Sequence, residues 1–172
     1  MKNLTKFLFL IFISLNLSFS QDFNINQSQQ QAIYLIDSAT FEGSEIDSED
    51  YILARTSEGV LVGASNYNGY GTDLVVMGQD VNIVIDDETY ILCETTGTCD
   101  YPEQGDNVYL SIYDTSQDQE FNPYSFSPEA VQQSVVFSTL INEDLISIDV
   151  LEDCSSTLGG ASIIDECGQC GG

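Results

Sequence analysis

The sequence predicts an all-β fold, a two-sheet antiparallel sandwich of the jelly-roll or immunoglobulin-like kind, followed by a short irregular tail rich in cysteine and glycine. Three observations predict it. Short segments of β-branched and aromatic residues recur along the chain, turn-forming residues separate them, and long segments with the helical period of 3.6 residues are lacking. In such a fold each sheet buries one face, and acidic residues occupy outer faces and loops. A barrel is the main alternative.

The first strands are predicted from composition and from the turns between them. Residues 31–41 (QAIYLIDSATF) combine apolar, β-branched and aromatic side chains. Residues 51–55 and 60–64 are joined by TSEG, which is typical of a hairpin turn. Further strands are predicted at 73–77 and 81–85, on either side of GQD.

The later strands follow the same pattern. Residues 89–93 come after two acids, and residues 108–113 alternate, with Val108, Leu110 and Ile112 on one side and Tyr109, Ser111 and Tyr113 on the other. The predicted strands 134–140 and 145–150 flank INED. Residues 128–134 are the one candidate for a helical turn.

The N-terminus has the pattern of a secretory signal peptide at residues 1–20. Lys2 and Lys6 precede a short apolar run, and small residues at Ser18 and Ser20 fit a cleavage site. The run is short for a membrane span, so we expect no membrane insertion after cleavage and a secreted or cell-surface protein. The predicted organisation is then a polar lead-in at 21–30, a sandwich domain at 31–152 and the tail at 153–172.

Cleavage would leave a strongly acidic chain. All 28 Asp and Glu residues follow residue 20, and Arg55 is the only basic residue left, so the formal charge becomes 1 − 28 = −27. Such a surface repels nucleic acid and anionic lipid, which excludes both as partners. It also repels itself, so we expect a salty or calcium-containing medium; a simple contribution to solubility is the alternative.

The five cysteines are expected to be oxidised, as is usual in a secreted chain. Cys93 and Cys99 flank the turn-like ETTGT, which predicts a local disulfide. Cys154, Cys167 and Cys170 leave an odd number in the tail. CGQC lacks the βα context of a redox motif, and a zinc ribbon needs a second such pair. A disulfide-stapled repeat with its last partner missing fits better, so we expect further domains downstream.

The tail DCSSTLGGASIIDECGQCGG resembles the DC-x-G-x-x-GG-x-A-x-x-D-x-CG-x-C-x-G segments of large secreted proteins of marine Bacteroidetes-type bacteria, which are exported through a C-terminal sorting domain. In those proteins the segments often occur in series. Ser156 stands where the family tends to have glycine. The matched positions are Asp153, Cys154, Gly159, Gly160, Ala161, Asp165, Cys167, Gly168, Cys170 and Gly171.

The body also resembles the sandwich domain that often precedes those segments. The similar stretches are QAIYLIDSATFEG, SEDYILARTSEGVLVGASNYNGYGTDLVVMG and GDNVYLSIYD. The resemblance implies an extracellular or cell-surface module, and it implies no catalytic activity.

The composition excludes several kinds of catalysis. The chain has no histidine, which excludes the usual Ser-His-Asp and Cys-His sites and metal-hydroxide chemistry on imidazole ligands. A glycine-rich phosphate loop before a helix is also lacking. We therefore expect no enzyme and no catalytic residue; a glycosidase built on two carboxylates is the alternative.

Calcium is the candidate metal ion, because it accepts oxygen ligands from irregular loops. In DTSQDQE (114–120), Asp114 and Asp118 are spaced like the start of an EF-hand loop, although the later glycine and acid of that motif are missing. A hairpin turn is the favoured alternative there. In the tail, Asp153 and Asp165 are the candidate ligands.

The NYNGYG loop offers a candidate ligand contact through Asn66, Tyr67, Asn68 and Tyr70, because aromatic rings and amides commonly bind sugars. The alternative is that the tyrosines pack against the rim of the sheet. A shallow groove with exposed tyrosines would favour sugar binding, and buried rings would favour a scaffold.

The function expected from these observations is a non-catalytic extracellular module for surface adhesion, spacing or assembly within a larger secreted protein. The alternative is a carbohydrate-binding module of a secreted polysaccharide-active protein. The expected partners are cell-surface or matrix components, with glycans among the candidates.

Overall fold

The computed structural model describes residues 23–86, 88–126, 130–139 and 141–171. The expected signal peptide lies outside these residues. The described chain is nearly all β, which confirms the predicted class, and its main sheet has nine strands. These are β1 (Gln31–Phe41), β2 (Ser44–Glu45), β3 (Tyr51–Arg55), β4 (Leu61–Asn66), β5 (Thr72–Met77), β8 (Asn107–Asp114), β9 (Gln119–Phe121), β12 (Ser134–Val136) and β13 (Ile141–Val150).

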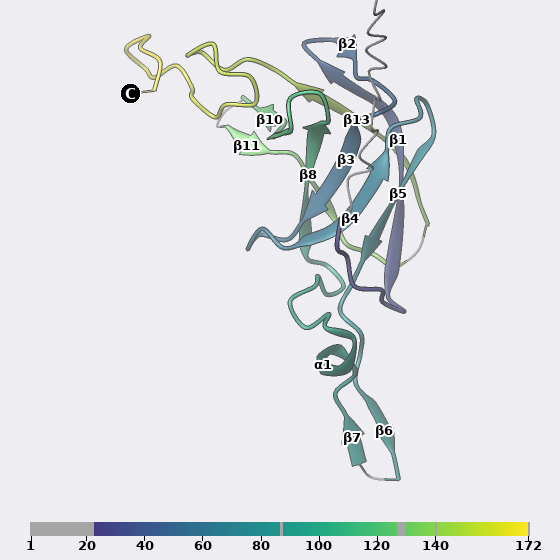
Figure 1. Cartoon of the computed structure of the whole chain (residues 1–172). Coiled ribbons are helices and arrows are strands. Elements are labelled where there is room, and N and C mark those ends of the chain that lie inside the picture. Colours follow the sequence, from purple (N-terminus) through teal and green to yellow (C-terminus); the bar gives the residue numbers. More distant parts are fainter. Residues whose placement is uncertain (1–22, 87, 127–129, 140, 172) are drawn as a thin grey trace, which may run out of the picture.

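The strand order of the main sheet is β12-β8-β3-β4-β5-β1-β13, with β2 paired to β1 and β9 paired to β8. The sheet curls into a half-barrel (Figure 1), so the two facing layers are parts of one continuous sheet. The two ends of the sheet are linked, because the side chain of Gln133 donates to the carbonyl of Ser147 at 2.9 Å. Tyr34 in turn donates its hydroxyl to the carbonyl of Val136 at 2.8 Å.

One pairing departs from the antiparallel prediction. Strand β13 runs parallel to β1, whereas the other strand pairs of the described main sheet are antiparallel. The residues INED (141–144), predicted to separate two strands, belong to β13, where Ile141 and Asn142 pair with Ile33 and Tyr34. The last strand therefore starts earlier than its hydrophobic alternation indicates.

The core fills the concave side of the sheet. On β8, Val108, Leu110 and Ile112 are fully buried, as their alternation predicts. Tyr113, on the opposite face, is buried as well, because the edge of Phe23 packs against Tyr113 and Tyr51, with ring centroids 5.7 and 4.9 Å apart. The core residues are Ala32, Tyr34, Ile36, Ala39, Ile46, Ile52, Ala54, Val62, Tyr67, Leu74, Val76, Met77, Tyr101, Val108, Leu110, Ile112, Phe121, Phe137, Ile148 and Val150.

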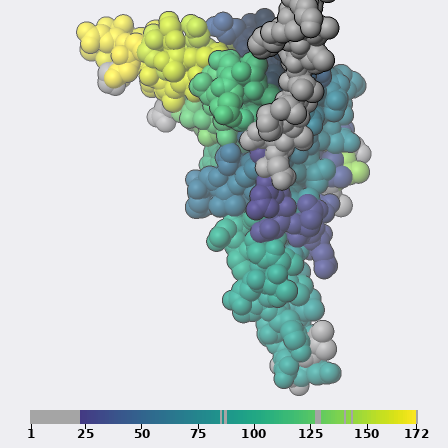
Figure 2. Space-filling view, in the orientation of Figure 1, coloured from purple at the N-terminus to yellow at the C-terminus, as the bar shows by residue number. Residues whose placement is uncertain are grey.

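The predicted strands 81–85 and 89–93 do not belong to the main sheet. They form a separate hairpin of β6 (Ile83–Ile85) and β7 (Glu88–Tyr90). The end of predicted strand 89–93 is instead the start of a short helix, α1 (Leu92–Thr96), which Gly97 ends with a left-handed φ of 73°. We call residues 81–91 the finger, because they project from one end of the body (Figures 1 and 2).

The predicted helical turn at 128–134 is wrong in its described part, where β11 (Val131–Gln132) pairs with β10 (Tyr124–Ser125) and β12 follows. Residues 128 and 129 lie outside the described residues. The backbone of Gln133 donates to the carbonyl of Pro123 at 2.8 Å, so this segment satisfies its polar groups as an extended chain.

Gly78 ends β5 against the core, and a Cβ at this position would overlap the ring of Phe137. We therefore expect Gly78→Ala to lower the free energy of unfolding by about 2 kcal/mol, because the buried ring of Phe137 would have to shift to make room for the added methyl group. Urea unfolding of a protein that comprises residues 21–172 measures this. Ser57→Ala, in an exposed turn, is the control and should stay within about 0.5 kcal/mol of wild type; equal midpoints for Gly78→Ala and wild type would contradict the overlap.

Candidate functional site

The cysteines form two disulfides in the described chain. Cys93 pairs with Cys99, which confirms the predicted local disulfide, and Cys154 pairs with Cys170. Cys167 is exposed and has no disulfide partner among the described residues. Two disulfides indicate an oxidising environment.

The tail consists of two turns with the same hydrogen bonds, twelve residues apart. Asp153 accepts the backbone N–H groups of Ser155 and Thr157 at 2.9 and 3.0 Å. Asp165 accepts those of Cys167 and Gln169 at 2.9 and 2.8 Å. In each turn the aspartate N–H also donates to the carbonyl four residues later. Each aspartate therefore organises its own turn.

These bonds affect the candidate calcium ligands of the tail. The hydroxyl of Ser155 and the N–H of Thr157 hold the pKa of Asp153 well below its usual range. Its second carboxylate oxygen accepts the N–H of Ser162 at 3.0 Å. Asp153 and Asp165 thus lie in successive turns, each bound by donors of the protein, and calcium binding there stays a prediction.

The candidate ligands in DTSQDQE lie in the hairpin turn between β8 and β9, the alternative that the sequence favoured. Asp114 accepts the N–H groups of Ser116 and Gln117 at 2.8 and 3.0 Å. Tyr113 donates its hydroxyl to Asp118, and this bond raises the pKa of Tyr113 to about 12. Within the described chain, no group of three or more acidic or cysteine side chains could hold a metal ion.

The two tyrosines of the NYNGYG loop differ: one is buried against the sheet and the other is exposed and accessible to a ligand. Tyr67 is 2% exposed and belongs to the core, and its hydroxyl donates to Glu45 at 2.8 Å. Its ring is therefore closed to a ligand. Tyr70 is 75% exposed, and Asn66 and Asn68 are exposed beside it, so ligand contact at this loop would depend on these three residues.

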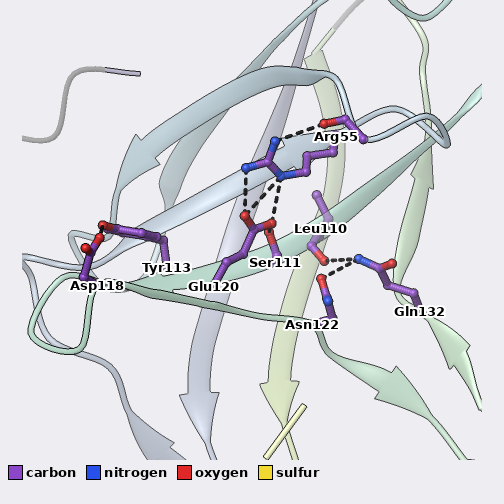
Figure 3. A network of polar contacts seen from close by, with 9 residues as sticks. Arg55, Leu110, Ser111, Tyr113, Asp118, Glu120, Asn122 and Gln132 are labelled. Carbon is purple, nitrogen blue, oxygen red and sulfur yellow. Dashed lines mark hydrogen bonds and ion pairs between the residues drawn. The ribbon is translucent and has the colours of Figure 1, made fainter. Parts of the chain in front are cut away.

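A polar network that the sequence did not reveal lies on the outer face of the sheet (Figure 3). The guanidinium of Arg55, on β3, donates from Nε and Nη2 to the carboxylate of Glu120, on β9, at 2.9 and 2.7 Å. The hydroxyl of Ser111, on β8, donates to the same carboxylate at 2.6 Å. The third guanidinium nitrogen, Nη1, donates to the carbonyl of Gly59 at 3.0 Å.

Strand register brings this network together. Arg55 pairs with Tyr109 across β3 and β8, and Glu120 pairs with Tyr113 across β8 and β9. Both charged side chains are partly exposed, at 32% for Arg55 and 27% for Glu120. Burial alone raises the pKa of Glu120, but the bonds from Arg55 and Ser111 outweigh it and lower the pKa below its ordinary value. Glu120 in turn raises the pKa of Arg55.

The network forms one wall of an open groove of about 500 Å³. The opposite wall carries two amides, since Gln132 donates to the side chain of Asn122 at 2.9 Å and to the carbonyl of Leu110 at 3.3 Å. The groove is lined by Arg55, Thr56, Ser57, Gly59, Tyr109, Glu120, Asn122 and Gln132. The only signal in the sequence was Arg55, the single basic residue after Lys6 in a chain with 28 Asp and Glu residues.

A second cavity, of about 460 Å³, lies at the base of the finger and includes Asp80. Asp80 is 3% exposed and accepts the hydroxyl of Ser28 at 2.9 Å and the N–H of Gln29 at 2.8 Å. Its other oxygen, Oδ2, has no hydrogen-bond partner among the described residues. Through these two hydrogen bonds Asp80 holds Ser28 and Gln29, which belong to the polar lead-in, at the base of the finger.

Comparison with family models, with curated proteins and with solved structures finds no match to this chain. In the described part of the chain, no helix has the length and apolar character needed to cross a membrane.

Asp80 is one of the carboxylates through which acid should lower the stability of the fold. Burial raises its pKa, but the N–H of Gln29 and the hydroxyl of Ser28, which donate to Oδ1, outweigh burial together with the nearby hydroxyls of Thr96 and Thr98 and lower the pKa. The ionised carboxylate therefore stabilises the fold above its unfolded pKa of about 3.9, and this contribution is lost as pH falls through the lower folded pKa.

We expect Asp80→Asn to lower the free energy of unfolding at pH 7 by about 1 kcal/mol and to flatten its decline below about pH 4. Urea unfolding across pH measures both effects. Asn82→Ala, which changes a non-titrating residue of the same cavity, should keep the wild-type slope. A wild-type slope in Asp80→Asn would show that the contribution lies elsewhere.

The pair Arg55–Glu120 is expected to behave as one unit. Arg55→Met leaves the partly buried carboxylate of Glu120 without its cation, and Glu120→Met leaves the guanidinium of Arg55 without its anion. Each substitution should therefore lower the free energy of unfolding by about 1 kcal/mol. The double variant should cost less than the sum of the two, because neither charge remains unpaired. A double-mutant cycle by urea unfolding measures the coupling, and strict additivity would contradict it.

Proposed function

We propose that this chain is a non-catalytic extracellular module that serves surface adhesion, spacing or assembly within a larger secreted protein. The observation that carries the proposal is the finger, which projects from a body whose core is complete without it (Figure 2). The two disulfides and the signal-like residues 1–20 support an extracellular location.

The finger presents apolar side chains to solvent. Its exposed fractions run from 39% for Ile83 to 68% for Val84, and Tyr90 and Ile91 are nearly half exposed. An isolated two-stranded hairpin buries little surface of its own, and clustered exposed apolar side chains mark interaction surfaces. The nearby Cys93–Cys99 disulfide constrains the chain just beyond the finger. This combination supports contact with an apolar surface of another macromolecule.

The negative charge of the chain limits which surfaces the finger can contact. With a formal charge of −27 on the mature chain, two copies repel each other, whereas a neutral or basic surface does not. The finger tip is itself acidic at Asp86 and Glu88. The proposed partner is therefore an apolar surface bordered by neutral or basic groups.

The carboxylates of the candidate sites support a structural role. Asp114, Asp118, Glu120 and Asp153 each accept hydrogen bonds from the protein, and Glu120 also pairs with Arg55. A catalytic pair of carboxylates would instead need one group free to donate a proton.

A carbohydrate-binding module is the second candidate function, and the polar groove beside Arg55 favours it. Sugar sites combine amides, charged side chains and aromatic rings, and this groove contains Asn122, Gln132, Arg55 and Tyr109. The two functions are compatible, because the groove lies on the body and the finger projects beyond it.

Adsorption tests the role of the finger. The mature chain should bind a methyl-terminated monolayer in about 0.5 M NaCl, which screens its charge. The variant Val84→Ser/Ile91→Ser should bind about tenfold more weakly, because it removes two exposed apolar side chains from the projecting element. A quartz crystal microbalance measures the bound mass.

The matched control is Val131→Ser/Val136→Ser, which changes two side chains of similar exposure, 56% and 55%, on the body. It should adsorb like wild type. If the finger variant and the control adsorb equally, the finger is not the adhesive element and the proposal loses its support.

A further inference from the structure

We infer that the groove beside the Arg55–Glu120 pair binds a neutral oligosaccharide. The inference rests on the carbohydrate-binding function proposed above as the second candidate, and it assigns that function to residues on β3, β8 and β9 rather than to the NYNGYG loop.

The size and position of the groove suit a small polar ligand. Its volume of about 500 Å³ lies in the range of small-molecule sites. A second depression of about 290 Å³ adjoins it, and Thr56, Ser57 and Tyr109 line both. A ligand of more than one sugar ring could therefore extend from one depression into the other across Tyr109.

The walls retain unused hydrogen-bonding groups. The contacts of Arg55 with Glu120 and Gly59 use three of the five guanidinium N–H groups, which leaves two as donors. The side-chain oxygen of Gln132 and the side-chain nitrogen of Asn122 have no hydrogen-bond partner among the described residues. Together they offer donors and an acceptor, as the hydroxyls of a sugar require.

The electrostatics of the groove favour an uncharged ligand. Among the described residues that line this groove, Glu120 is the only carboxylate and it neutralises the charge of Arg55, so these residues offer no unpaired charge to an ionic partner. An anion would in addition meet the field of a chain whose mature charge is −27. A neutral ligand that exchanges hydrogen bonds avoids both costs.

The site is also rigid before a ligand arrives. Arg55 and Glu120 lie on β3 and β9, which both pair with β8. The hydroxyl of Ser111 binds Glu120, and the carbonyl of Gly59 binds Arg55. Tyr109 lies directly opposite Arg55 in the sheet and is partly buried, which restricts its ring. Groups that are fixed in advance lose little conformational entropy on binding.

The single arginine makes the inference directly testable. Arg55 gives the only arginine Nε–H signal in a ¹H–¹⁵N spectrum of this chain, and Arg55→Lys identifies it by its loss. The mature wild type is titrated with cellohexaose, laminarihexaose, mannohexaose and xylohexaose. At least one of these should shift the Nε–H signal in a saturable way, and a hexamer of galacturonic acid should not.

Two variants locate the binding. Tyr109→Ala should weaken the affinity for the bound hexamer about tenfold, because it removes the ring shared by the two depressions. Tyr70→Ala, which removes the exposed ring of the NYNGYG loop, should leave the affinity unchanged. Thermal unfolding of both variants confirms that they are folded.

The outcomes separate the inference from the function on which it rests. Binding that is lost in Tyr70→Ala and kept in Tyr109→Ala, without a shift of the Arg55 signal, would overturn the groove and leave the carbohydrate-binding function in place. Absence of binding by all four neutral hexamers would overturn both. A shift of the Arg55 signal with the galacturonic acid hexamer alone would contradict the inference that the ligand is neutral.

Discussion

The structure depends on β1, which is hydrogen-bonded along both of its edges. It pairs antiparallel with β5 on one side and parallel with β13 on the other, so it joins the sequential strands to the last one. Its side chains Ala32, Tyr34 and Ile36 are buried, and Tyr34 reaches across to the carbonyl of Val136 at the far end of the sheet. Strand β1 therefore contacts both ends of the curled sheet, because it pairs with β13 and reaches β12 through Tyr34.

Local features were predictable from the sequence because they are encoded by neighbouring residues. Strands β1 and β3 have the predicted bounds, since each is rich in apolar, β-branched and aromatic residues and is followed by turn residues. The Cys93–Cys99 disulfide was also predictable, because a short turn brings its two ends together. The hairpin turn at Asp114 and Asp118 belongs to the same class, because its bonds connect residues a few positions apart.

Long-range arrangements were not predictable. Alternation of apolar and polar residues indicates which side chains of a strand are buried, but it does not indicate which other element they pack against. The segment 81–85 alternates like a strand of the main sheet, yet it forms part of the finger. Tyr67 and Tyr70 are three residues apart in one polar loop, and only the register of the sheet decides that one is buried and the other exposed. Arg55 and Glu120 are separated by 65 positions, so no local pattern could pair them.

The disulfide of the tail has a mechanical consequence. Cys154 and Cys170 are 16 positions apart, and they enclose most of the two aspartate turns. A pulling force applied to the chain on either side of this covalent link passes through the two sulfur atoms and bypasses the residues between them. The residues between the two cysteines would therefore carry no load under tension, and the disulfide would limit how far this part of the chain can be extended.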